Sequence, residues 1–411
     1  MSSIPEDLYL QILIRVPVKS ALVCKCVCKK WLDLISSSEF VQLHLHFNIQ
    51  KNNYNLVLNN AVNEFSRSCL LQSISYDSLS VTGRIVCQDG VIKMDYPFKS
   101  SDYQVELRCA YHGLVFLCFS DYCTEILCLW NPATTEFKIL PKLPGLNFDI
   151  ADLYMSAFFD IYTLGYDDKM EDYKLVKVLI AGTNTFVYIY TLGSNSWKCI
   201  GTIPYKFPYH EGPSPSGEIF NGALHWLVKT VTSYMSVVSF NIADEKFEEL
   251  PLPEKLQEKK ESLACLGKWD ECLSLLVNSN NFQFDVWVMQ EYGVHESWTK
   301  RSSITLTFVA DDSFYSRTLI NVWGSHNNSH RLRIMWSFKN GKILFEFCGD
   351  VFLYDLKSET YKRIRTLVSN AENYIESLVS LNSSAFVSGL KTRGVNLKHK
   401  GKGKDIVCGF H

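Results

Sequence analysis

One pattern recurs five times beyond residue 100, and it restricts the fold of this 411-residue chain more than any other feature. Each copy is an apolar run that ends in an aromatic residue, then a polar turn, then a second aromatic residue that opens another apolar run. The two aromatic residues are 7 positions apart in four copies and 11 apart in the remaining one, which indicates four inserted residues. The pairs are Trp130 and Phe137, Tyr190 and Trp197, Phe240 and Phe247, Trp287 and Trp298, and Tyr354 and Tyr361.

This repeat predicts a mainly β body made of similar units. The leading aromatic residues follow one another at intervals of 60, 50, 47 and 67 residues. Before two copies lies an Asn-Gly pair, at Asn221 and at Asn340, which favours a tight hairpin because both central residues of a type I′ turn need positive φ. Antiparallel units of this size, joined radially, form a β-propeller. A degenerate unit near Leu70 raises the expected number to about six blades; five or seven blades and a β-sandwich are the alternatives.

Residues 4–45 predict something different, a small α head of three to four short helices. Pro5 suits the first position of a helix, where its missing N–H is not needed. Leu8 and Ile12 recur at helical spacing, and Pro17 ends that helix. A unit of about forty residues rarely stabilises itself without metal, disulfides or a partner. We therefore expect a helical partner to cover this head.

Three closely spaced cysteines are the only candidate metal ligands in the head. Cys24, Cys26 and Cys28 are two positions apart, so they do not all share one face of a helix. We expect them to be small core or boundary residues, and we expect no metal.

The same segment resembles an F-box, the module that binds the Skp-type adaptor of SCF ubiquitin ligases. The resemblance is carried by Ile4-Pro5, Ile12-Leu13, Pro17, Cys26-Val27 and Trp31. It implies binding to a Skp-type adaptor and, through it, to cullin and RING subunits. The adaptor contacts that it implies are Ile4, Pro5, Leu8, Ile12, Leu13, Pro17, Leu22, Val27 and Trp31. The alternative is a helical dimerisation cap.

Residues 105–365 resemble the kelch-like F-box-associated domain of plant F-box proteins. The phrases that carry this likeness are HGLVFL, LWNPATTEFKILP, NGALHWLV and SFNIADEKFEELPLP. The stretch VWVMQEYGVHESW, from Val286, is similar to S-locus F-box proteins, which would imply an S-RNase as the substrate and a role in pollen self-incompatibility. The expected domains are an F-box at 1–45, a linker and first degenerate blade at 46–104, the F-box-associated domain at 105–390 and a basic disordered tail at 391–411.

Motifs for catalysis are missing from the sequence. It has no phosphate-binding glycine loop and no GxSxG motif. We expect Asp167-Asp168 and Asp311-Asp312 to be solvated in turns, and we expect His326 and His330 to lie in a polar loop. Cys118, Cys123 and Cys128 are expected to be core or boundary residues, and the tryptophans of the repeat are expected in the blade cores. The chain is therefore expected to be a non-catalytic adaptor without a cofactor; a propeller enzyme or a carbohydrate-binding module with a helical cap is the alternative.

Charge and hydropathy restrict the partners further. The formal net charge is −2, which argues against a dedicated nucleic-acid partner. The apolar runs are far shorter than the roughly 18 residues that span a bilayer, so no membrane contact is expected. The first residues do not read as a signal peptide, which favours a cytoplasmic or nuclear location with reduced cysteines.

Substrate recognition is expected on the loops between blade strands, because loops tolerate change while strands are fixed by packing. The longest such stretches are 142–163, 204–218 and 300–331. In the second, prolines stiffen the chain and Tyr209 and His210 are expected to be exposed, so these two residues are the candidate substrate contacts.

Overall fold

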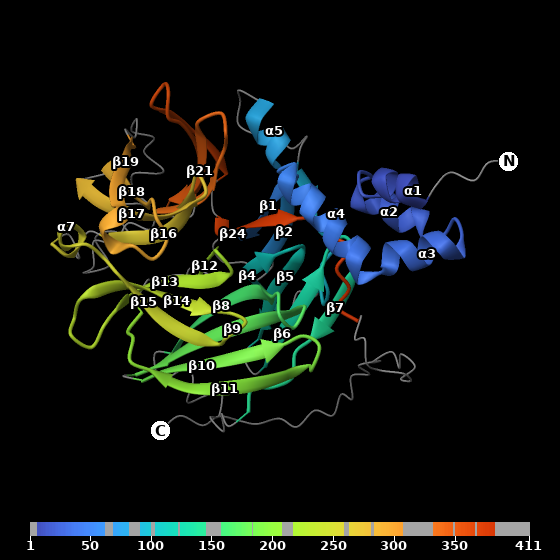
Figure 1. The fold of residues 1–411 in the computed structure, drawn as a ribbon, viewed down its shortest axis with the longest axis horizontal. Coiled ribbons are helices and arrows are strands. Elements are labelled where there is room, and N and C mark those ends of the chain that lie inside the picture. Colours follow the sequence, from blue (N-terminus) through green and yellow to red (C-terminus); the bar gives the residue numbers. More distant parts are fainter. Residues whose placement is uncertain are drawn as a thin grey trace, which may run out of the picture.

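A small helical head is followed by six four-stranded antiparallel sheets in the described part of the chain (Figure 1). The computed structural model describes residues 6–61, 69–81, 91–99, 103–121, 124–144, 158–182, 184–207, 217–258, 263–280, 283–306, 332–347, 350–365 and 368–382. The expected basic tail lies outside the described residues. The mainly β class, the helical head and the number of six blades are confirmed.

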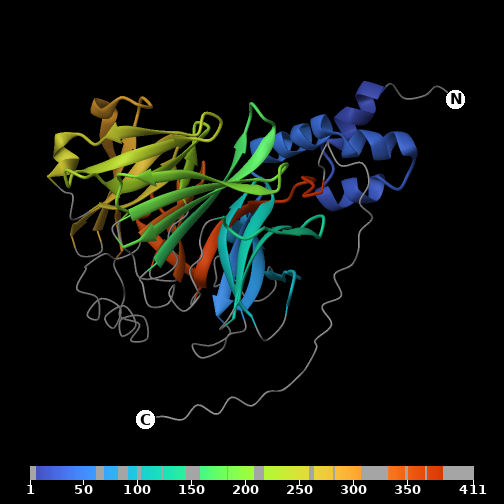
Figure 2. The ribbon, with the colours of Figure 1, turned by 90° about the horizontal axis from the view of Figure 1, so that it is seen from below.

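The head contains four helices and forms a cluster beside the sheets (Figures 1 and 2). The helices are α1 (Glu6–Leu13), α2 (Val18–Cys24), α3 (Lys29–Ser36) and α4 (Ser38–Gln50). Pro17 precedes α2 as its N-cap residue, as expected for a proline that ends one helix and starts the next. Ser37 begins α4, because its hydroxyl accepts a hydrogen bond from the Phe40 N–H at 3.2 Å.

The first three sheets, blades I to III, follow the head. Blade I contains β24 (Val368–Ile375), β1 (Tyr54–Ala61), β2 (Cys69–Ser75) and β3 (Val91–Lys93). Blade II contains β4 (Gln104–Tyr111), β5 (Leu114–Ser120), β6 (Glu125–Asn131) and β7 (Glu136–Ile139). Blade III contains β8 (Phe158–Asp167), β9 (Asp172–Ala181), β10 (Asn184–Thr191) and β11 (Ser196–Ile203).

Blades IV to VI complete the ring. Blade IV contains β12 (Glu218–Phe220), β13 (Ala223–Lys229), β14 (Met235–Asn241) and β15 (Lys246–Pro251). Blade V contains β16 (Leu263–Trp269), β17 (Cys272–Asn280), β18 (Gln283–Met289) and β19 (Trp298–Thr305). Blade VI contains β20 (Leu332–Ser337), β21 (Lys342–Phe347), β22 (Asp350–Asp355) and β23 (Thr360–Arg365). Among the residues that the structure describes, three short helices lie outside both the head and the sheets: α5 (Tyr76–Val81), α7 (Glu254–Gln257) and η3 (His295–Ser297).

Blade I closes the ring by joining the two ends of the propeller. Its strand β24 comes from the end of the described chain and pairs antiparallel with β1, Tyr54 lying opposite Ile375. Strand β24 is the inner strand of blade I, as β4, β8, β12, β16 and β20 are in the other blades. The inner strands of several adjacent blades contact one another, for example β24 with β4 and β16 with β20. This closure packs blade I between blades VI and II, so no blade face is left exposed as it would be at the ends of an open array.

The repeated aromatic pairs are direct cross-strand neighbours in four blades, as their spacing predicts. Trp130 lies opposite Phe137, and the same register holds at Tyr190 and Trp197, Phe240 and Phe247, and Tyr354 and Tyr361. The leading member is buried in each of these pairs. The second members are less uniformly covered: Trp197 is 9% exposed, Phe247 and Tyr361 are half-buried, and Phe137 is 45% exposed. It lies on β7, the outermost strand of blade II, where Phe98 packs edge-on against it and covers only part of the ring.

The fifth pair has a different register. Trp298 lies opposite Met289, and the positions equivalent to the other pairs hold Val288 and Thr299. The inserted four residues are confirmed, because the last paired residues are 9 apart in blade V and 5 apart elsewhere, as from Asn131 to Glu136. Trp298 is buried and Trp287 is half-buried.

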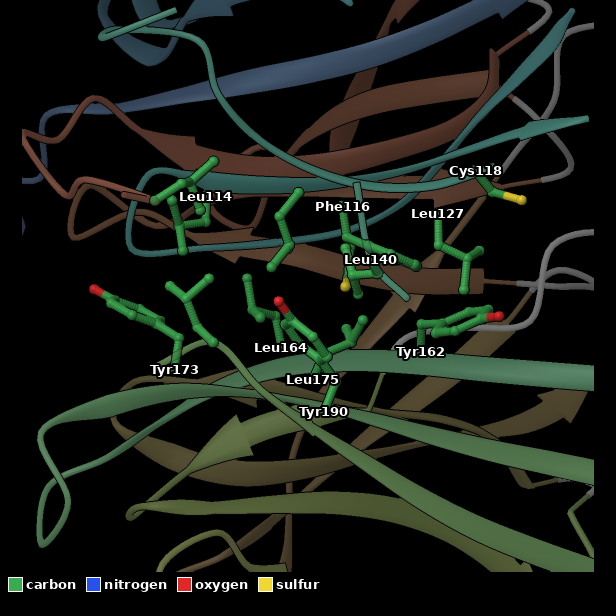
Figure 3. Close-up of a cluster of buried hydrophobic side chains, with 14 of the residues drawn as sticks. Leu114, Phe116, Cys118, Leu127, Leu140, Tyr162, Leu164, Tyr173, Leu175 and Tyr190 are labelled. Atoms are coloured by element: carbon green, nitrogen blue, oxygen red, sulfur yellow. The ribbon is translucent and has the colours of Figure 1, made fainter. Parts of the chain in front are cut away.

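Apolar side chains from facing sheets fill the space between blades. Between blades II and III, Leu114, Phe116 and Cys118 face Leu164, Leu175 and Tyr190 (Figure 3). Cys118 belongs to this core, whereas Cys128 belongs to the core on the other side of blade II. The prediction that these cysteines are core or boundary residues is confirmed for these two; Cys123 lies outside the described residues.

Candidate functional site

The helical head carries large apolar side chains that its own fold leaves exposed to solvent. Of the fourteen large apolar side chains that are exposed in the described part of the chain, six belong to the head. Single exposed apolar residues are ordinary, but exposed apolar patches are typical of interaction sites, so this concentration makes the head a candidate interaction surface. We call five of them the head surface: Leu8, Ile12, Val23, Val27 and Leu32.

The residues that the F-box resemblance assigns to the adaptor contact differ in how far their side chains are exposed to solvent. Four are exposed: Leu8, Ile12, Pro17 and Val27. Two are half-buried: Leu22 and Trp31, the latter packing edge-on against Tyr9. Leu13 is only 2% exposed and lies in the interior of the head, because adjacent helical residues point in directions roughly 100° apart. Ile4 and Pro5 lie outside the described residues.

Two members of the head surface, Val23 and Leu32, are absent from the contacts expected from sequence. Both follow a residue that was expected, Leu22 and Trp31, which face partly inward. An apolar residue beside an inward-facing one on a short helix is the signal that identifies them. The same region corrects an expectation about cysteines, since Cys26 and Cys28 are exposed in the turn between α2 and α3 and are not core residues.

The segment after β24 joins the head to the propeller. Leu378 is buried within the head, in contact with the cluster that contains Leu13 and Phe40. The neighbouring residues Val379 and Leu381 belong to the core between blades II and III. One short segment therefore contributes to both cores, so the head and the propeller share their interior packing.

Polar contacts fix the same segment. The Asn131 amide donates to the carbonyl oxygens of Ser377, at 3.1 Å, and Val379, at 2.7 Å. The Glu136 carboxylate accepts from the Leu381 N–H at 2.7 Å. Gly113 permits this approach, because a Cβ there would lie 2.1 Å from the Ser377 hydroxyl.

Helix α4 is the second element of the joint between the head and the propeller, beside the segment after β24. His44 is fully buried, and its Nε2 lies 2.8 Å from the Val16 carbonyl oxygen, which ties α4 to the segment after α1. Burial lowers the pKa of His44, while the hydrogen bond to Val16 opposes the shift. The Gln42 amide donates to the Tyr166 hydroxyl of blade III at 3.2 Å. These contacts orient the head surface relative to the blades.

The expected recognition stretches leave the blades on the face away from the head. Strand β24 ends beside the head, so the inner strands end on the head side and begin on the opposite side, which we call the distal face. The three stretches connect the outer strand of one blade to the beginning of the next inner strand, which places their ends at the distal face. Tyr209 and His210 lie outside the described residues.

A described turn on the distal face exposes two apolar side chains that sequence reasoning missed. Val231 and Tyr234 are both well exposed in the turn between β13 and β14. The Thr230 N–H donates to the Tyr234 carbonyl oxygen at 2.9 Å, which fixes the turn. The stretch that contains Tyr209 begins next to it, because Lys206 and Lys229 exchange two backbone hydrogen bonds. This rigid turn is a candidate substrate contact.

Charged side chains on and beside the inner strands form ion pairs within and between blades II and III, which sequence reasoning also missed. Arg108 lies 2.6 Å from Glu106 and 3.8 Å from Asp160, and Lys177 lies 2.9 Å from Asp160. Burial acts to raise the pKa of Asp160, but Lys177 and Arg108 outweigh it, so the pKa is lowered. The signal was present as charged residues that interrupt apolar runs, such as Glu106 and Arg108 in VELRCAY. These charges are paired with each other, and no group of three candidate metal ligands occurs among the residues that the structure describes.

Asp167 corrects another expectation, because it is buried. Its side chain is 0% exposed and lies 2.8 Å from the Lys174 Nζ, which also contacts Glu245 of blade IV at 2.9 Å. Burial acts to raise the pKa of Asp167, but the hydrogen bonds from Lys174 and from backbone N–H groups lower it overall. Lys174 therefore links Asp167 of blade III to Glu245 of blade IV. Asp311, His326 and His330 lie outside the described residues.

Comparison with known proteins covers nearly the whole chain. Residues 1–43 match the model of the F-box domain, and residues 64–381 match that of the F-box associated beta propeller domain. The F-box protein CPR1 of Arabidopsis thaliana is 26% identical over 97% of this chain and 92% of its own length. An F-box/kelch-repeat protein of the same plant is 27% identical over 92% of this chain and 96% of its own length. These relatives do not show the S-locus likeness that VWVMQEYGVHESW suggested.

Solved structures are similar only in outline. TolB from Acinetobacter baumannii has a TM-score of 0.42 at 8% identity, over 82% of this chain and 73% of its own. Such a score carries no argument about function. Among the described residues, no helix is long and apolar enough to cross a bilayer. Because the F-box associated beta propeller domain matches more than half of the chain and an F-box precedes it, the protein belongs to the plant-type F-box family with an F-box-associated β-propeller domain.

Proposed function

We propose that this chain is the substrate-recognition subunit of an SCF-type ubiquitin ligase. The observation that carries the proposal is the head surface, an exposed apolar set on the module that matches an F-box. Burial of apolar area against a Skp-type adaptor would be the main driving force of docking. The adaptor would bring cullin and RING subunits, and this chain would contribute proximity between substrate and ubiquitin-charged enzyme without making or breaking a bond itself.

The joint between head and propeller supports separate roles for the two parts, adaptor binding by the head and substrate binding by the propeller. The segment that contains Leu378 and Val379 packs into both parts, so the distal face keeps a fixed direction relative to the adaptor. The substrate would bind on the distal face, through the Val231–Tyr234 turn and the three long stretches, including Tyr209 and His210. A fixed direction matters because ubiquitin transfer requires the acceptor lysine to reach the charged enzyme.

The decisive experiment replaces Ile12 or Val27 with Asp and measures co-purification with a Skp-type adaptor. Both side chains are exposed, so the variants should fold normally and lose the adaptor. Val231→Asp is the matched control, since it puts the same charge at an exposed apolar position on the distal face. Undiminished adaptor binding by both head variants would overturn the proposal.

A narrower proposal concerns the substrate and the location. The phrase VWVMQEYGVHESW supports an S-RNase as substrate and a role in pollen self-incompatibility, with action in the cytoplasm or nucleus. In the structure, Tyr292 of this phrase packs against Phe220 and bonds His225 Nε2 at 2.8 Å, so part of the phrase joins blades V and IV. A binding assay between the adaptor complex and purified S-RNases tests this role; absence of any binding would exclude it.

A further inference from the structure

Strand β7, the outermost strand of blade II, exposes two large apolar side chains. Phe137 is 45% exposed and Ile139 is 49% exposed, and they share one face of the strand because they are two positions apart. In the part of the chain that the structure describes, no other strand exposes two such side chains; β15 of blade IV, for example, exposes Lys246, Glu248 and Glu249. An exposed apolar edge strand is a template for pairing with a further strand, and proteins normally cover or charge it.

The backbone of the same two residues is also directed outward. The Leu140 N–H donates to the Leu127 carbonyl oxygen of β6 at 2.9 Å, and the register between β6 and β7 has no shift. Alternate residues of an antiparallel strand bond to the neighbouring strand, so the N–H and C=O groups of Phe137 and Ile139 point away from β6. Within the described residues, no strand lies along that side of β7.

The described chain ends beside the first residue of β7. The Glu136 carboxylate accepts from the Ser380 hydroxyl at 2.8 Å and from the Leu381 N–H at 2.7 Å. Figure 1 shows this end of the chain, in red, next to β7. The described residues stop at position 382, and residues 383–390 read SSAFVSGL. The Phe-Val pair in this segment is of the aromatic and β-branched kind that strands favour.

We propose that residues 383–390 pair with the outer edge of β7 as a fifth strand of blade II. The segment starts beside Glu136, so it runs parallel to β7, and its side chains lie beside Phe137 and Ile139. Extended at about 3.3 Å per residue, its eight residues reach about 26 Å, twice the length of the four-residue β7. Backbone pairing along an exposed edge is the recognition mode that this geometry offers.

This pairing has a consequence for the basic residues that follow. Strand β7 runs away from the head toward the distal face, and a parallel fifth strand would take the chain in the same direction. Residues 391–411, which contain six Lys or Arg residues and one Asp, would then begin on the distal side of blade II and not at the joint with the head.

Hydrogen exchange, followed at single amides in the full chain, tests the pairing. The amides of Phe137 and Ile139 should be protected in the wild type, because they would donate to the added strand. A chain that stops after residue 382 should exchange both amides at least tenfold faster, whereas a chain that stops after residue 390 should keep the protection. The amide of Lys138, which faces β6, is the internal reference and should stay slow in all three chains, showing that blade II is folded.

A double proline variant tests the segment without shortening the chain. Two neighbouring residues of a strand direct their N–H groups to opposite sides, so Phe386→Pro together with Val387→Pro removes one hydrogen bond to β7 in either register. This variant should exchange the amides of Phe137 and Ile139 as fast as the chain that stops after residue 382. Val395→Pro together with Asn396→Pro, beyond the segment, is the matched control and should exchange as the wild type does.

Four results would overturn the proposal. Rapid exchange of both amides in the wild type would show that solvent covers the edge, and protection that survives the stop after residue 382 would show that another segment covers it. Protection that rises with protein concentration would assign the edge to a second copy of the chain. Unchanged protection in the double proline variant would exclude backbone pairing by this segment. The measurement needs neither adaptor nor substrate, so its outcome is independent of the proposed function.

Discussion

The side-chain amide of Asn131 donates a hydrogen bond of 2.7 Å to the carbonyl oxygen of Val379, 248 residues further along the chain. Asn131 ends the third strand of blade II, and Val379 follows the strand that closes blade I. A second bond from the same amide reaches Ser377. One buried side chain thus holds the segment on which the direction of the head depends.

Asn131→Ala should destabilise this joint. Two buried carbonyl oxygens would lose their donor, at roughly 1–3 kcal/mol for each one left unpaired. Urea denaturation should show the loss in the free energy of unfolding. Asn241→Ala is the matched control, because Asn241 ends the third strand of blade IV and its side chain, among the described residues, accepts from the turn N–H groups of Ala243 and Asp244 alone. Equal losses in the two variants would contradict the special role of Asn131.

Ile12 and Leu13 are neighbours that should respond in opposite ways to replacement by alanine. Leu13 is 2% exposed, so Leu13→Ala should lower the free energy of unfolding by about 2–5 kcal/mol through the cavity that it leaves. Ile12 is 56% exposed, so Ile12→Ala should hardly change stability but should weaken adaptor binding. Chemical denaturation and calorimetric titration with the adaptor measure the two effects. If Leu13→Ala alone weakened the adaptor contact, the head surface would be wrongly defined.

Trp197 and Phe137 occupy the same position of the repeat, but their replacement by alanine should lower the free energy of unfolding by different amounts. Trp197 is 9% exposed, and its Nε1 donates to the Pro141 carbonyl oxygen at 2.8 Å. Trp197→Ala should therefore lower the free energy of unfolding by about 3–5 kcal/mol. Phe137→Ala should cost much less, because nearly half of that side chain already meets solvent. Similar losses in thermal and urea unfolding would show that β7 is more covered than we describe.

The blade architecture could be predicted because the repeat fixes it locally. A turn of four residues sets the pairing of Trp130 with Phe137, and the same count appears in three more blades. Blade V shows the limit of this reasoning. The sequence predicts the four inserted residues, but it pairs Trp298 with Trp287 because both are tryptophans. In the structure Trp298 lies opposite Met289 instead.

The buried charges could not be predicted, because their partners are distant in the sequence. Asp167 lies in a turn-like stretch, and only the neighbouring blade brings Glu245 to Lys174, 71 residues away. Arg333 and Glu372 likewise meet only when the ring closes. In the head, helical periodicity and the F-box resemblance identified Leu8, Ile12 and Val27, but adjacent residues such as Leu13 required the packing itself.

Lys174→Met should destabilise the contact between blades III and IV. It would leave Asp167 buried without its cation, a change that typically costs about 3–5 kcal/mol. Lys198→Met is the control, because Lys198 also contacts Glu245, at 2.6 Å, but is mostly exposed and should contribute little. Urea denaturation at pH 7 measures both losses; a loss as small for Lys174→Met as for Lys198→Met would contradict the importance of the buried pair.

The pH dependence of stability gives a second measure of Asp167. Its pKa is lowered in the folded protein, so ionised Asp167 stabilises the fold at pH values above its unfolded pKa of about 4. This contribution is lost as the pH falls through the lower folded value. The wild type should therefore lose stability on acidification, and Asp167→Asn, which does not titrate, should lose less over the same range. Urea midpoints from pH 6 to pH 3 test this; parallel curves for the two proteins would show that Asp167 does not contribute to acid sensitivity.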